Sequence, residues 1–220
     1  MIKLIIFDLD GVLVDTESLH KRALIEAAYT ITGIEFETLN VLFSIDGKTT
    51  STKLKNLQAL YNLNDNILNR IDALKQSIVV SSMPSIINTN VDHRGMLSEL
   101  EREYTVSLAS NSRRENVDLI LDLLNITDLF STVVAGNEVL ATKPDPYIFN
   151  KIMELHNISP AHTLILEDSP AGKHAAKLSG AHLLEVNSIN DVTLENIKYE
   201  LQQISANNSC ANGRDGISIY

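Results

Sequence analysis

Ile5-Ile6-Phe7-Asp8-Leu9-Asp10-Gly11-Val12 is the stretch near the start of the chain that decides its fold class. The apolar run from Lys3 to Leu9 predicts a buried strand, with Asp8 and Asp10 at its carboxyl end. Alternate residues of a strand point to the same side, so the two carboxylates share one side of this strand end. Ligands of open α/β sheets bind at that edge. For this motif alone, a strand that ends in an acidic turn is an equally good explanation.

The composition sets limits on the class of protein. The chain has 220 residues, 44% of them hydrophobic, and a net charge of −10. This charge disfavours nucleic acid and anionic membranes as partners, whereas a phosphorylated small molecule stays possible if a bound cation reverses the local field. Cys210 is the only cysteine, which excludes a disulfide framework. No signal peptide and no apolar run of membrane-spanning length is recognisable, so we expect a cytoplasmic protein, by default a monomer.

Strand-like apolar segments alternate with helical patterns along most of the chain. Val117, Ile120, Leu121 and Leu124 show the helical spacing, as do residues 148–155. This alternation predicts an α/β fold, a Rossmann-like doubly wound parallel sheet. The predicted strands are Lys3–Leu9, Thr105–Ala109, Thr132–Ala135, Thr163–Leu166 and His182–Val186.

The connection between the first two strands is far longer than an ordinary crossover. From Thr16 to about Gly95 the apolar spacing is helical throughout, which predicts an inserted all-α cap domain over the carboxyl edge of the sheet. We therefore expect a core of residues 1–15 and 91–204, and a helical cap of residues 16–90. The polar segment 205–220 is expected to be disordered.

Two further motifs supply groups that suit a phosphate. Ser110 ends the second strand with a hydroxyl, and the turn after it is suited to capping a helix. Lys143 precedes Pro144, which favours an extended backbone, and Asp145 is expected to start a helix. A rigidly held lysine can neutralise a phosphate or a developing negative charge. Each motif alone has a commoner structural explanation as a turn or a solvated loop.

The remaining motifs add acids and a histidine. Glu167 and Asp168 follow another buried strand, and four carboxylates at one edge would repel each other unless a cation held them. Hard oxygen ligands at this density suit Mg²⁺. His20 lies at the entry to the helical insert, where it could relay a proton, although a lone helical histidine is more often structural.

In this order and spacing the motifs resemble the haloacid dehalogenase superfamily of aspartate-nucleophile phosphohydrolases, over roughly residues 3 to 190. The β-phosphoglucomutase-like members, which carry a helical cap, are the most similar in pattern. The resemblance implies that Asp8 is the nucleophile and Asp10 the general acid and base. It implies Mg²⁺ on the Asp8 carboxylate, the Asp10 carbonyl and Asp168, supported by Glu167. Ser110 and Lys143 would hold the transferring oxygens.

Substrate choice in this superfamily resides in the cap. The segment Asp46–Lys53 resembles its specificity loop, but Thr50 stands where β-phosphoglucomutases carry an arginine for a second phosphate, which counts against a mutase. We therefore expect a Mg²⁺-dependent phosphatase for a sugar or polyol phosphate. The alternatives are a β-phosphoglucomutase-type mutase, a non-catalytic binding module and a haloacid dehalogenase. The expected substrate-binding residues are His20, Gly47, Lys48, Thr49 and Asn111.

Overall fold

The computed structural model of the chain describes residues 1–43, 50–87 and 92–212. The chain divides into two compact units: Met1–Val14 together with Thr89–Tyr220, and Asp15–Asn88. We call them the sheet unit and the helical unit, and each is described by itself.

The sheet unit contains a parallel sheet of five strands in the order β3-β2-β1-β4-β5. The α/β fold with a doubly wound parallel sheet is therefore confirmed. Each predicted strand is present, with ends that differ by no more than two residues. The strands are β1 (Leu4–Phe7), β2 (Thr105–Ser110), β3 (Thr132–Ala135), β4 (Thr163–Glu167) and β5 (His182–Glu185).

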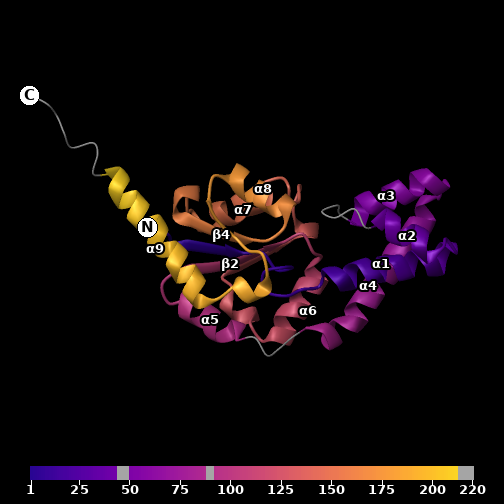
Figure 1. The fold of residues 1–220 in the computed structure, drawn as a ribbon, viewed down its shortest axis with the longest axis horizontal. Coiled ribbons are helices and arrows are strands. Elements are labelled where there is room, and N and C mark those ends of the chain that lie inside the picture. Colours follow the sequence, from indigo (N-terminus) through magenta and orange to yellow (C-terminus); the bar gives the residue numbers. More distant parts are fainter. Residues whose placement is uncertain (44–49, 88–91, 213–220) are drawn as a thin grey trace, which may run out of the picture. The chain divides into compact units, whose positions relative to one another are not determined.

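Helices cover both faces of this sheet (Figure 1). The α-helices are α5 (His93–Leu100), α6 (Arg114–Leu124), α7 (Tyr147–His156), α8 (Pro170–Ser179) and α9 (Leu194–Asn212). Within the sheet unit, α5 and α6 lie on one face, and α7 and α8, which connect β3 to β4 and β4 to β5, lie on the other, as right-handed crossovers require. Short 3-10 helices are η1 (Thr127–Leu129), η2 (Gly136–Glu138), η3 (Pro160–His162) and η4 (Ile189–Asp191).

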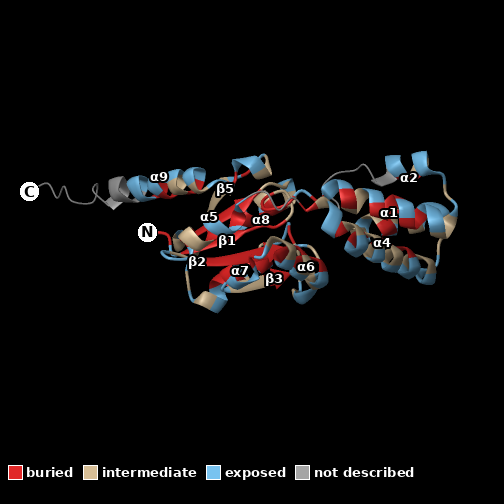
Figure 2. Cartoon of the chain, turned by 90° about the horizontal axis from the view of Figure 1, so that it is seen from below, coloured by how far each residue is buried: buried red, intermediate tan, exposed pale blue. Residues whose placement is uncertain are grey.

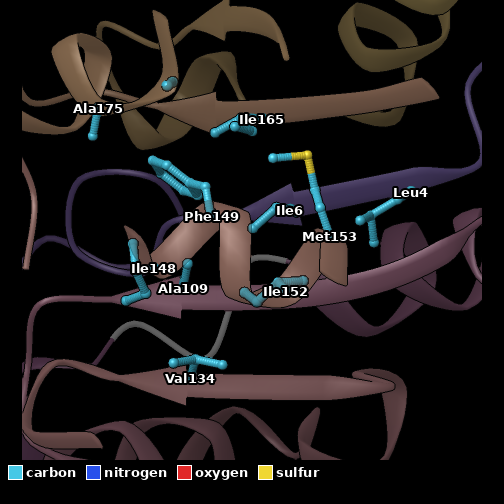
Figure 3. Close-up of a cluster of buried hydrophobic side chains, with 11 residues drawn as sticks. Leu4, Ile6, Ala109, Val134, Ile148, Phe149, Ile152, Met153, Ile165 and Ala175 are labelled. Atoms are coloured by element: carbon cyan, nitrogen blue, oxygen red, sulfur yellow. The ribbon is translucent and has the colours of Figure 1, made fainter. Parts of the chain in front are cut away.

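A cluster of buried apolar side chains joins α7 and α8 to the sheet (Figure 3). Strand β1 contributes Leu4 and Ile6, which have the same parity and so point to one face. On the opposite face, the Phe7 ring meets Phe130 edge-on at 6.4 Å between centroids. Both faces of β1 are thus buried, which explains its uninterrupted apolar sequence and is visible in Figure 2. The α7 and α8 side chains in the cluster are Ile148, Phe149, Ile152, Met153, Ala175 and Ala176.

The helical unit has its own apolar core. Helix α1 (Glu17–Thr32) packs mainly against α4 (Asp65–Ile86), and α2 (Phe36–Phe43) and α3 (Thr50–Tyr61) complete the described part. One helical stripe of each contributes to the core, as the apolar spacing predicts. The buried side chains are Leu24, Ile25, Ala27, Ala28, Leu39, Leu54, Leu57 and Ile71.

Three local expectations differ from the structure. Helix α9 continues to Asn212 and so enters the segment 205–220, for which the polar composition predicts disorder; buried Ile197, Leu201 and Ile204 anchor its start. Helix α7 starts at Tyr147, two residues after Asp145, whose side chain accepts a hydrogen bond from the Tyr147 N–H at 2.8 Å. The residue that caps α6 is Arg113, and its side chain makes no capping bond.

Within the described residues, no helix is long and apolar enough to cross a membrane.

His93, in the first turn of α5, makes stability depend on pH. Its side chain is 2% exposed and lies against the Leu13 carbonyl; burial lowers its pKa below the ordinary 6.5, although the Leu13 carbonyl and Asp92 oppose this. Below pH 6.5 the unfolded chain binds a proton that the folded chain does not, so the free energy of unfolding falls as the pH decreases. For one proton, the change in the free energy of unfolding with pH approaches at most about 1.4 kcal/mol per pH unit.

We expect His93→Gln to remove this contribution. Urea unfolding at pH 7.5 and pH 5.5 should show a smaller loss of stability on acidification in the variant than in the wild type. His174→Gln, at an exposed histidine of α8, is the control and should retain the wild-type pH dependence. Equal acid destabilisation in the His93 variant and the wild type would show that His93 is not the responsible group.

Candidate active site

Three carboxylates gather at the carboxyl edge of the sheet, between β1 and β4. Asp8, Glu167 and Asp168 each offer an oxygen, and these oxygens lie within 4.8 Å of one another. The parallel register pairs Phe7 with Leu166, and the Asp8 N–H extends the ladder to the Leu166 carbonyl at 3.0 Å. The two acidic motifs, far apart in the sequence, therefore meet because β1 and β4 are neighbours.

Lys143 lies at the centre of this cluster. Its Nζ donates to Asp8 Oδ1 at 2.5 Å, to Glu167 Oε2 at 2.7 Å and to the Ala109 carbonyl at 2.9 Å. The side chain is only 3% exposed, and its ammonium lies 4.9 Å from the centre of the Phe149 ring. One cation thus joins the ends of β1, β2 and β4 and rests on an aromatic side chain of the core.

The charges of this site do not balance. Burial disfavours the charged form of Lys143, but Asp8 and Glu167 outweigh it and raise the pKa of Lys143. Burial, followed by the charge of Glu167, raises the pKa of Asp8 well above its ordinary value, against the opposing effect of Lys143. Burial and the charge of Glu167 also raise the pKa of Asp168 to about 6. Three ionised carboxylates and one ammonium would leave two negative charges, which the surrounding protein resists.

Glu167 is held by the start of α8. Its Oε1 accepts hydrogen bonds from the Asp168 N–H at 3.1 Å, the Ser169 N–H at 3.0 Å and the Ser169 hydroxyl at 2.9 Å. Burial would raise the pKa of Glu167, but Lys143 and these donors lower it. A Cβ at Gly172 would overlap the Glu167 carboxylate, so the helix approaches it closely only because this residue is glycine.

Asp168 differs from Glu167 in its partners. Its Oδ1 is buried and accepts no hydrogen bond from the described residues. The carboxylate lies against Gly11, whose φ of +85° suits glycine and where a Cβ would overlap Asp168. A buried carboxylate oxygen without a donor is costly unless a cation binds it. The hard oxygen donors, the excess negative charge and this unsatisfied oxygen together fit a divalent cation such as Mg²⁺.

Asp10 is half-buried, and its carboxylate stands outside the cluster of three acids. Its Oδ2 accepts a hydrogen bond from the Ser112 hydroxyl at 2.8 Å. The sequence did not single out Ser112 as a site residue, because a serine two residues beyond a strand has no signal of its own. The contact between Ser112 and Asp10 follows from the pairing of β1 with β2, which the sequence around Ser112 does not indicate.

Ser110 and Asn111 lie at the end of β2 and in the turn that follows it. Ser110 is fully buried and its Oγ accepts from the Ser112 N–H at 3.0 Å, so its hydroxyl proton could still be donated to a bound oxygen. Asn111 hydrogen bonds through its amide to the main chain of Lys143. The structure therefore brings Asp8, Ser110, Lys143, Glu167 and Asp168 to one edge of the sheet unit.

The predicted cap residues belong to the helical unit. His20 is in α1, and its Nδ1 lies 3.1 Å from Nζ of Lys75, a buried lysine of α4 that the sequence did not single out because it falls within an ordinary amphipathic pattern. Gly47, Lys48 and Thr49 lie outside the described residues, so their expected part in substrate binding stays a prediction.

Comparisons with known proteins agree with this fold and identify the family. A family model described as haloacid dehalogenase-like hydrolase matches residues 5–186. A phosphorylated carbohydrates phosphatase of Thermotoga maritima is 28% identical over 193 residues, which cover 85% of this chain and 87% of that protein. The β-phosphoglucomutase of Bacillus subtilis is 28% identical over 229 residues, covering 91% and 96%. A crystal structure of β-phosphoglucomutase from Clostridium difficile has a TM-score of 0.75 at 23% identity, covering 94% of this chain and 100% of that chain.

The fold is an α/β fold with a cluster of buried carboxylates and a lysine at the carboxyl edge of a parallel sheet, the edge at which such folds bind ligands. With the family model matching most of its length, the chain belongs to the haloacid dehalogenase-like hydrolases.

We expect Gly172→Ala to lower the free energy of unfolding, because the added methyl group would displace the buried Glu167 carboxylate. The expected loss is about 1–3 kcal/mol. Helix propensity alone predicts the opposite sign, a gain of about 1 kcal/mol for alanine in α8. Urea unfolding at neutral pH distinguishes the two, and a more stable variant would mean that the site adapts without cost.

Proposed function

We propose that this chain is a Mg²⁺-dependent phosphatase that hydrolyses a small phosphorylated metabolite, a sugar or polyol phosphate, through an aspartyl-phosphate on Asp8. The observation that carries the proposal is the buried contact between Lys143 and Asp8 beside the unsatisfied oxygen of Asp168. The similarity to relatives named as phosphatases supports the same reaction class.

In the first half of the reaction, an ionised Asp8 oxygen attacks phosphorus and the bond from phosphorus to the leaving oxygen breaks. Lys143 favours the ionised form of Asp8 through its charge, against the effect of burial. Ser110 and Lys143 would donate hydrogen bonds to the transferring oxygens. Asp10 would give its proton to the leaving alkoxide, and the hydrogen bond from Ser112 orients the Asp10 carboxylate for this step.

In the second half, water attacks the phosphorus of the aspartyl-phosphate. Asp10, now ionised, accepts a proton from that water, and the bond from phosphorus to Asp8 breaks. Inorganic phosphate leaves, and Asp8 and Asp10 return to their starting protonation states. Both halves of the reaction use the same two aspartates. Asp8 and Asp10 can act together because alternate residues place them on the same side of the strand end.

The metal fits the residues that would hold it. Asp8 and Asp168 would bind Mg²⁺ through carboxylate oxygens and Asp10 through its carbonyl, while Glu167 would support them from the side of Lys143. When bound, the ion would supply positive charge that offsets the excess negative charge of the site and of the phosphoryl group.

A mutase is the second candidate function. Relatives named β-phosphoglucomutase match nearly the full length of the chain, and such an enzyme would use the same aspartyl-phosphate but return the phosphoryl group to a sugar. A mutase needs a site for a second phosphate, and Thr50 in place of an arginine counts against one.

The decisive experiment measures phosphate release from a panel of sugar, polyol and nucleotide monophosphates, with Mg²⁺ and with a chelator. The panel includes β-glucose 1-phosphate, analysed for glucose 6-phosphate in the presence of a bisphosphate primer. We expect metal-dependent release of phosphate from one or a few compounds. Isomer formation with little free phosphate would establish the mutase instead, and release that persists in chelator would contradict the metal requirement.

We expect Asp8→Asn to reduce turnover of the best substrate by roughly 1000-fold or more, because the amide is a poor nucleophile. Asparagine retains the shape of the side chain, so circular dichroism should show a folded protein. Asp122→Asn, at an exposed residue of α6, is the matched control and should keep wild-type turnover. Substantial turnover by the Asp8 variant would show that Asp8 is not the nucleophile.

A further inference from the structure

The main chain of Lys143 is held by a side chain rather than by secondary structure. Asn111 Oδ1 accepts the Lys143 N–H at 3.0 Å, and Asn111 Nδ2 donates to the Lys143 carbonyl at 3.1 Å. The two bonds form a closed pair of the kind that joins residues of neighbouring strands. We call this arrangement the Asn111–Lys143 pair.

This pair supplies the main-chain hydrogen bonds of Lys143. In the described part of the chain, the Lys143 N–H and carbonyl make no other hydrogen bond. The following residue, Pro144, has no N–H to donate. The nearest turn bond, from the Asp145 N–H to the Thr142 carbonyl at 3.0 Å, spans Lys143 without contacting it. The position of the Lys143 backbone therefore depends on Asn111.

Asn111 can serve as an anchor because its own backbone is fixed. It follows directly on the buried Ser110 at the end of β2. The main chain of Asn111 packs against Gly136 so closely that a Cβ there would not fit, and the Gly136 N–H donates to the Ser112 carbonyl at 2.9 Å. The ends of β2 and β3 thus hold Asn111, and Asn111 holds Lys143.

We propose that Asn111 is a positioning residue for Lys143: it fixes the lysine backbone so that Nζ reaches Asp8, Glu167 and the Ala109 carbonyl together. This role differs from substrate binding, and its kinetic consequence rests on the proposed phosphatase function. The three acceptors lie 2.5–2.9 Å from Nζ, so a small movement of the backbone weakens several contacts at once. Misplacement by about 1 Å can cost roughly 100-fold in rate.

The kinetic experiment compares Asn111→Ala with the wild type on the best substrate from the phosphate panel. A positioning residue predicts a kcat lowered roughly ten- to hundredfold and a KM within about twofold of wild type. Asn196→Ala is the matched control, because the Asn196 amide also donates to a main-chain carbonyl, that of Asp191 at 2.8 Å, on the far helix α9. Its kcat and KM should equal those of wild type.

A second experiment tests the Asn111–Lys143 pair by a measurement that does not depend on enzymatic activity. Amide hydrogen exchange of Lys143, followed by NMR on ¹⁵N-labelled protein, should be roughly three- to tenfold faster in Asn111→Ala than in wild type. Asn111→Asp retains the acceptor for the Lys143 N–H and should exchange more slowly than Asn111→Ala.

The two experiments separate the possible failures. Unchanged exchange in Asn111→Ala would overturn the Asn111–Lys143 pair. A raised KM with unchanged kcat would overturn the positioning role and make Asn111 a substrate contact. If the wild-type protein hydrolyses no phosphate monoester, the proposed function fails, and the exchange measurement alone then decides whether Asn111 holds Lys143.

Discussion

The pairing of the Lys143 ammonium with Asp8 and Glu167 is the interaction on which the site depends. All three groups are buried, and a buried charge is tolerated only when it is paired and hydrogen bonded. Without the lysine, the carboxylates would repel one another, and the sheet edge could not hold them in place. The same ammonium rests on Phe149, which belongs to the core between α7 and the sheet. The site and the hydrophobic core are therefore in direct contact through Phe149.

Sheet order explains how distant residues reach this lysine. Strand β1 lies between β2 and β4, so the residues that end these strands are neighbours at one edge. The chain then crosses from β3 to β4 over the other face, and the loop that makes this crossing carries Lys143. Two glycines complete the arrangement, because Gly11 and Gly172 leave the space that the Asp168 and Glu167 carboxylates occupy.

Much of this could be predicted from the sequence, because the strands and their terminal acids are local signals. Apolar runs that end in Asp8 and in Glu167 locate both the sheet and its functional edge. The contacts of Ser112 with Asp10 and of Asn111 with Lys143 could not be predicted, since each joins residues far apart in the chain. Helix α9 shows the opposite limit: polar composition predicts disorder, but buried apolar residues at its start sustain a helix that runs further.

The two neighbouring acids at the end of β4, Glu167 and Asp168, differ in their hydrogen bonds and therefore in the part each can play. Both Glu167 oxygens are engaged, one by Lys143 and the other by three donors at the start of α8. Asp168 keeps a buried oxygen without a donor from the described residues, and its pKa is raised to about 6 by burial and by Glu167. A cation beside the two acids would be stabilised most by Asp168 Oδ1, which accepts no hydrogen bond within the described part of the chain. In the proposed enzyme, Asp168 rather than Glu167 would therefore bind the metal directly, while Glu167 holds Lys143 and the turn that carries Asp168.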